Sequence, residues 1–151
     1  MCEIIEVFYS GLLVEYSNDI EKGKFISQSI SANTVAHQGD KITVIYSLGK
    51  EPTTEEKNAL KKAENYSNSL HMSKKGIYNQ LTSSIEGFTK EAAQYAIDNI
   101  DVDWNKNALE KAKSYQTSMS MSSKAIYNQL VSSVEGFTKS EAQYAIDHLG
   151  D

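Results

Sequence analysis

The chain has 151 residues, of which 40% are hydrophobic and 23% charged, with a formal net charge of −5, a composition typical of soluble globular proteins. Apart from histidine, every basic residue is a lysine. Because arginine is the usual ligand of phosphate and guanine, its absence and the acidic balance argue against nucleic acid as a partner. No run of 18 apolar residues occurs, so no membrane-spanning helix is predicted. The single cysteine, Cys2, excludes an internal disulfide and a cysteine-rich metal site.

Residues 1–50 are predicted to form a small α+β domain. Segments 12–16, 26–31 and 42–48 are rich in residues that favour strands, whereas 3–10 fits either a helix or a strand. The segments ISQS and ITVIYSLG follow acidic and glycine-containing turns in the order of a PASTA domain, and this part resembles the C-terminal two-thirds of that family. The resemblance implies a wall-facing domain, because PASTA modules are associated in some proteins with peptidoglycan.

The rest of the chain is a tandem repeat. Residues 58–98 return at 107–147 with an offset of 49, and 28 of the 41 aligned positions are identical. Such a period means that each copy is one supersecondary unit, expected to pack against its neighbour because a lone core of this size is marginal. Pro52, the only proline, marks the preceding boundary. The predicted domains are therefore 1–50, 51–102 and 103–151.

Each repeat is predicted to be a bundle of three short helices, the last two with helix-turn-helix geometry. The predicted N-caps of the three helices are Thr54, Ser73 and Thr89 in the first copy and Asp103, Ser122 and Thr138 in the second. Gly87 and Gly136 are expected to close the second helix of each copy. The predicted apolar faces include Leu70, Ile77, Leu81, Ile85, Ala93, Ala96 and Ile97, with Met119, Ile126, Leu130, Val134, Ala142, Ala145 and Ile146 as their equivalents.

Two sets of side chains are candidate interaction sites. Trp104 stands where the first copy has Glu55, and it is predicted to pack into the seam between the copies. Acidic residues around the junction either hydrogen-bond tyrosines and cap helices, or form a patch that binds a basic segment of a protein partner. The candidate partner-binding residues are Asp98, Asp101, Asp103, Asp147, Glu86 and Glu135.

No motif in the chain indicates catalysis. His37, His71 and His148 are far apart in sequence, and neither a nucleophile motif nor a calcium-loop spacing occurs. We therefore expect a non-enzymatic protein without cofactor or metal. The predicted recognition helix, TKEAAQYAIDNI, lacks the basic side chains that contact DNA.

The repeats also resemble a known family. The pattern around YAIDNIDVDWNKNAL, over residues 55–151, is similar to the Ltp-like repeats of host cell surface-exposed lipoproteins. This resemblance implies display on Gram-positive cells, a prophage origin, and superinfection exclusion through blocked DNA injection, with the phage tape-measure protein as partner. No signal peptide is visible, but Cys2 directly after Met1 fits a lipidated cysteine as well as an ordinary thiol. Membrane contact would then occur only through that lipid anchor. The alternatives are a peptidoglycan-binding module and a cytoplasmic prophage regulator that contacts nucleic acid.

Overall fold

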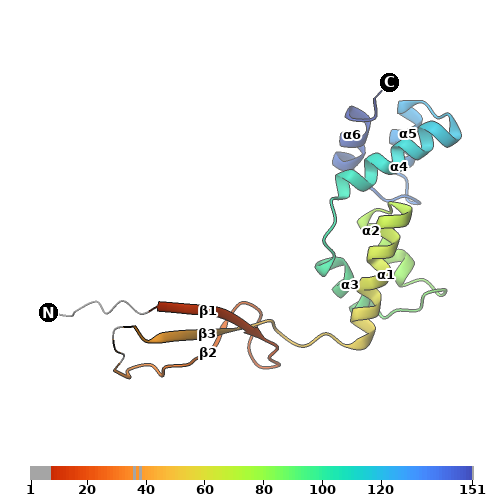
Figure 1. The fold of residues 1–151 in the computed structure, drawn as a ribbon. Helices are drawn as coiled ribbons and strands as arrows, with labels where there is room; N and C mark the ends of the chain where they lie inside the picture. The colour runs from red at the N-terminus through yellow and green to blue at the C-terminus, as the bar shows by residue number, and fades with distance from the viewer. Residues whose placement is uncertain (1–7, 36, 38, 151) are drawn as a thin grey trace. The chain divides into compact units, whose positions relative to one another are not determined.

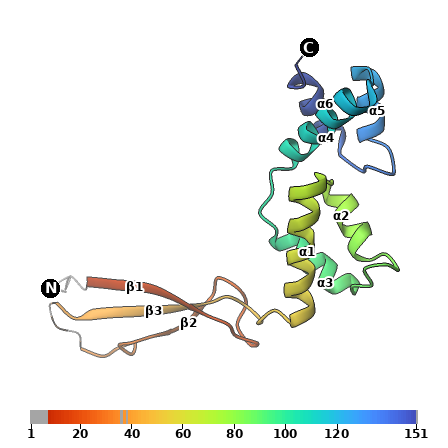
Figure 2. The ribbon, with the colours of Figure 1, turned by 45° about the vertical axis from the view of Figure 1, so that its right-hand side comes forward.

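The computed structural model describes residues 8–35, 37 and 39–150, and the chain divides into two compact units between Pro52 and Thr53. Cys2 lies outside the described residues. The first unit contains strands β1 (Phe8–Glu15), β2 (Phe25–Gln28) and β3 (Lys41–Ser47), and the second contains six helices. Figures 1 and 2 show both units. The predicted order of a small strand-containing region followed by helical repeats is confirmed.

The first unit is a three-stranded sheet in the order β1-β3-β2. β3 pairs in parallel with β1 and antiparallel with β2, so the three predicted strand segments are all confirmed. In the described part of this unit, strands are the only regular elements. The aromatic rings of Phe25 and Tyr46 meet edge-on with centroids 6.3 Å apart. The PASTA resemblance of this unit stays a prediction.

The second unit consists of two three-helix bundles in succession (Figures 1 and 2). The first bundle contains α1 (Thr54–Leu70), α2 (Lys74–Leu81) and α3 (Lys90–Asn99), and the second contains α4 (Trp104–Met119), α5 (Ser123–Leu130) and α6 (Lys139–Asp147). The first helix of each bundle packs mainly against the third. The many alanines of the two cores allow this close packing. The first core is Ala59, Ala63, Ile77, Leu81, Ala92, Ala93, Ala96 and Ile97. The second core is Ala108, Ala112, Ile126, Leu130, Phe137, Ala142, Ala145 and Leu149. None of the helices within the described ranges has the length and apolar run needed to cross a bilayer.

Five of the six predicted N-caps are confirmed by their hydrogen bonds; they are Ser73, Thr89, Asp103, Ser122 and Thr138. The cap of α1 is Thr53 rather than Thr54. Thr53 is favoured because Glu56 completes a capping box with it: the Glu56 amide donates to Thr53 Oγ1 at 3.2 Å, and the Thr53 amide donates to Glu56 Oε2 at 2.6 Å.

The second helix of each bundle is shorter than predicted. It ends at Leu81 or Leu130, and Ile85 and Val134, predicted as core residues, are 85% and 78% exposed. The chain turns after the helix, and the amide of the next phenylalanine donates back to the carbonyl of Leu81 or Leu130. The glycine before that phenylalanine has a positive φ and closes this turn rather than the helix.

The last turns of α1 and α4 were also predicted to be buried, and Leu70 and Met119 are instead exposed. α1 has 17 residues whereas its main packing partner α3 has 10. We attribute the exposure to this difference in length, because the end of the longer helix has no third helix beside it.

Candidate functional site at the seam between the repeats

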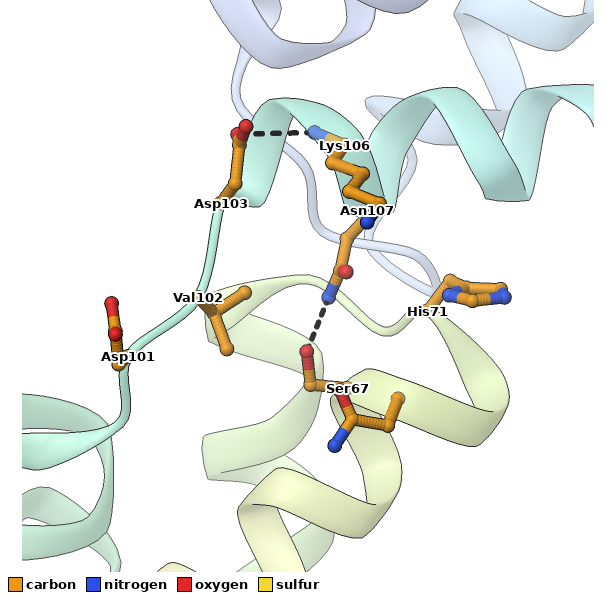
Figure 3. A pocket seen from close by; sticks show the side chains of 8 residues that line it. Ser67, His71, Asp101, Val102, Asp103, Lys106 and Asn107 are labelled. Atoms are coloured by element: carbon orange, nitrogen blue, oxygen red, sulfur yellow. Dashed lines mark hydrogen bonds between the residues drawn. The ribbon is translucent and has the colours of Figure 1, made fainter.

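A buried amide on α4 ties the two bundles together. Asn107 donates from Nδ2 to Ser67 Oγ at 2.8 Å and to the carbonyl of Met72 at 3.0 Å, both in the first repeat, as Figure 3 shows for Ser67. Asn107 and Ser67 are both buried. Because a buried amide without partners costs about 1–3 kcal/mol, these bonds fix the start of α4 against the end of α1. Asn58, its equivalent in the first repeat, is exposed.

A serine at the start of α2 makes the second contact across the seam. The buried Ser73 accepts from the Gly76 amide at 2.9 Å as the helix cap, and its hydroxyl also donates to the carbonyl of Glu135. Gly76 leaves room for this hydroxyl, since a Cβ there would lie only 3.1 Å from Ser73 Oγ. The equivalent Ser122 is an exposed cap, and Ala125 replaces the glycine.

Trp104 crosses the same seam. It is the first residue of α4, in the second repeat, yet its half-buried side chain packs against the core of the first. Its equivalent Glu55 has a different partner: the Thr89 amide donates to Glu55 Oε1 at 2.9 Å.

A polar pocket of about 290 Å³ opens at this seam (Figure 3). Two of the predicted site residues, Asp101 and Asp103, lie on the linker between α3 and α4, and His71 lies at the opposite side of the pocket, after α1. Asp103 Oδ1 accepts from the amides of Asn105 and Lys106, at 3.0 and 3.2 Å, as the cap of α4. Both aspartates are exposed to solvent. The pocket is lined by Ser67, Asn68, His71, Asp101, Val102, Asp103, Lys106 and Asn107.

The other predicted aspartates lie at the ends of the third helices. Asp98 and Asp147 are exposed, and each accepts a hydrogen bond from a glutamine one turn earlier, Gln94 or Gln143, at 2.8 and 2.7 Å. Asp98 is three residues before Asp101 but lies on the last turn of α3, and it does not line the pocket. Asp147 ends α6 in the second repeat and does not line the pocket.

The two predicted glutamates, in contrast, are largely buried. The side chains of Glu86 and Glu135 are only 13% and 14% exposed. Glu86 accepts from the Tyr66 hydroxyl and from Lys62 Nζ at 3.1 Å. These bonds hold the pKa of the Glu86 carboxyl below its ordinary value, with the tyrosine as the larger cause. The glutamate thus joins the turn after α2 to α1, and it is not part of an outer acidic face.

The second repeat has the same arrangement. The Tyr115 hydroxyl donates to Glu135, and Lys111 Nζ lies 3.8 Å from Glu135 Oε2. Burial, and then the bond to Glu135, raises the pKa of Tyr115 to about 12. The structural alternative for acidic residues, a hydrogen bond to a tyrosine hydroxyl, therefore describes these two glutamates.

Several pocket residues were not predicted from the sequence. Ser67 and His71 differ between the copies, with Gln116 and Ser120 as their equivalents, and such differences could have pointed to them. Asn107 gave no such signal, because Asn58 is identical to it. Within the described ranges, no group of three or more histidine, cysteine, aspartate or glutamate residues is placed to hold a metal ion.

Comparison with known proteins gives two matches for the helical unit. Residues 54–100 and 103–149 each match the family model described as host cell surface-exposed lipoprotein. The structure of Ltp, a superinfection exclusion protein from the Streptococcus thermophilus temperate phage TP-J34, is similar at 43% sequence identity and a TM-score of 0.61. The similarity covers 66% of this chain and 100% of that one. A search of curated proteins finds no match.

Proposed function

Because the chain belongs to the family of host cell surface-exposed lipoproteins, we propose that it is a binding protein of the cell surface that excludes incoming phage. It captures a phage protein and so blocks DNA injection, without catalysis or a cofactor. The similarity to a phage superinfection exclusion protein supports this role. The tape-measure protein, which the family resemblance suggests, is our candidate partner.

The observation that carries this proposal is the acidic pocket at the seam. Asp101 and Asp103 line it and are exposed, whereas Asp98, also exposed, lies on α3 outside the lining. Lys106 is the only lysine that lines the pocket. Charged groups of this kind attract a partner of opposite charge and orient it. A basic segment of the partner would therefore bind here, in contact with both repeats at once.

Neutral variants of the two pocket aspartates test the proposal. We would display the chain on a phage-sensitive Gram-positive host, behind a lipoprotein signal peptide that ends before Cys2, and measure phage plating and phage DNA entry. Asparagine is as good a helix cap as aspartate, so Asp101→Asn with Asp103→Asn removes charge but keeps the fold. From about 0.2–1 kcal/mol per exposed pair, partner affinity should fall about two- to thirty-fold, and plating should rise.

Asp147→Asn removes one charge at the end of α6, away from the pocket, and is the matched control for each aspartate variant made singly. It should protect as well as the unchanged chain. Equal protection by all variants at equal surface amounts would refute the acidic pocket as the binding site, and no protection by the unchanged chain would refute exclusion itself.

We also propose Cys2 as the point of lipid attachment. Cys2→Ser should abolish the incorporation of labelled fatty acid into the displayed protein, whereas continued incorporation would contradict lipidation at this residue. Mass spectrometry of the labelled protein identifies the modified residue.

A further inference from the structure

A second pocket lies at the seam, and it shares no residue with the acidic one. Its volume is about 400 Å³, within the range of about 300–1,000 Å³ that is usual for ligand pockets. One wall comes from α2 and α3 of the first repeat and the other from the start of α6 and the turn before it. The lining residues are Lys74, Lys75, Tyr78, Gln94, Ile97, Gly136, Thr138 and Glu141.

The walls of this pocket combine apolar surface with unpaired positive charge. Ile97 belongs to the first core, and the Tyr78 ring packs half-buried beside that core. Lys74 and Lys75 are exposed, and neither forms an ion pair with another residue in the described part of the chain. The one carboxylate in the lining, Glu141, accepts from the Thr138 amide at 2.8 Å and so completes the capping box of α6. The pocket is thus locally basic in a protein whose net charge is −5.

Two glycines bring the walls together. A Cβ on Gly136 would lie 3.3 Å from both Lys75 Cβ and Ser73 Oγ, and one on Gly76 would lie 3.1 Å from Ser73 Oγ, whose hydroxyl donates to the Glu135 carbonyl. Lys74 has Ser123 as its equivalent in the second repeat, and Gly76 has Ala125. The extra lysine and the glycine therefore occur in the copy whose α2 faces the seam.

We propose that this pocket binds an acidic segment of a partner protein, with an apolar side chain against Tyr78 and Ile97 and carboxylates beside Lys74 and Lys75. Most of the lining surface is apolar, so a lipid is the competing occupant, and vesicles test it below. The inference does not depend on the proposed function, since the two pockets have different residues and prefer opposite charges.

Short peptides and NMR spectroscopy test the proposal on the intact, isotope-labelled chain. The probe is a blocked peptide with one phenylalanine between glutamate pairs, GEEFEEG. As this peptide is added, the chemical-shift changes of the protein's backbone amides should reach saturation. The largest changes should occur at residues 74–78, 94–97 and 136–141. The peptides GEESEEG, without the ring, and GSSFSSG, without the charges, should each bind more weakly, and GKKFKKG should not shift these amides.

A matched pair of lysines supplies the variant test. Lys75→Gln should weaken binding of GEEFEEG about two- to five-fold, as expected for loss of one exposed charge pair. Lys124→Gln removes the equivalent lysine of the second repeat, outside the pocket, and should leave binding unchanged. Lys74→Ser, which installs the second repeat's own residue, should act like Lys75→Gln.

Four outcomes would overturn the proposal. They are the absence of saturable shifts with GEEFEEG, equal binding of GSSFSSG, equal effects of Lys75→Gln and Lys124→Gln, and shifts at these amides with phosphatidylglycerol vesicles but not with the peptide. The last outcome would assign the pocket to a lipid surface. None of these results bears on the aspartate variants, so the two proposals can fail separately.

Discussion

The two repeats differ most informatively at a pair of helix starts. In the first repeat, Glu55 of α1 accepts from the Thr89 amide at the start of α3. In the second, Trp104 replaces that glutamate, and Glu141, in a capping box, accepts from the Thr138 amide instead. Both third helices therefore begin with the same donor satisfied. Because Glu141 accepts this bond in the second repeat, the position equivalent to Glu55 can hold a tryptophan that packs across the seam.

Equivalent positions near α2 and α5 also differ between the two repeats, and the first repeat has the residues that contact the seam. Gly76 and Ser67 of the first repeat contact residues of the second, whereas Ala125 and Gln116 replace them in the second repeat. Gln116 Nε2 donates instead to the carbonyl of Gly150, within its own repeat. The positions that are identical in the two repeats maintain two similar cores. Several of the positions that differ between the repeats form the seam and its pockets.

The largest expected effect comes from the tryptophan. Trp104→Ala should destabilise the chain by about 2–4 kcal/mol, somewhat less than a fully buried tryptophan, because the ring is half-buried. Glu55→Ala, at the equivalent position, removes the exposed acceptor of the Thr89 amide and should cost about 0.5–1 kcal/mol. Urea unfolding followed by circular dichroism measures both. Equal losses of unfolding free energy in the two variants would show that Trp104 adds no packing across the seam.

The next largest effect on stability distinguishes Asn107 from Asn58, the asparagine at the equivalent position of the first repeat. Asn107→Ala removes both hydrogen bonds to the first repeat and should cost about 1–3 kcal/mol. Asn58→Ala changes an exposed residue and should stay within about 0.5 kcal/mol of the unchanged chain. The same unfolding measurement applies. A harmless Asn107→Ala would show that the amide does not hold the seam.

The smallest effect concerns pH. The pKa of Tyr115 is about 12 in the folded chain, against about 10 for an unperturbed tyrosine. Because the folded state holds this proton more tightly, the contribution to stability is complete below about pH 10 and is lost as the pH rises towards 12. Tyr115→Phe should therefore cost about 1 kcal/mol at neutral pH, and it should lose less stability than the unchanged chain on going to high pH. Paired urea titrations at neutral and alkaline pH measure this, and identical alkaline losses would contradict it.

Much of the helical unit could be predicted from sequence because its signals are local. Capping residues such as Ser73 and Thr138, together with the repeat period, locate helices whatever lies around them. The exposure of Ile85 could not be read in this way, because an apolar residue at helical spacing looks the same whether the helix continues or turns.

The seam itself was predictable only in part. Trp104 attracted attention because an aromatic residue replaced a charged one, whereas Asn107 has the same side chain as its exposed equivalent. Its role depends on Ser67 and Met72, which are distant in sequence. Glu86 and Glu135 resembled surface charges for a similar reason: the tyrosines and lysines that engage them lie on another element.

Both pockets depend on a seam that joins the two repeats into one cooperative unit. The most direct test changes Ile126, fully buried in the second core, to valine, which should cost about 0.5–1.5 kcal/mol. Hydrogen exchange of the intact chain then reports on α1–α3. We predict that the slowest-exchanging amides of the first repeat lose the same protection as those of the second. Unchanged protection in α1–α3 would show that the repeats unfold independently and that the seam does not couple them.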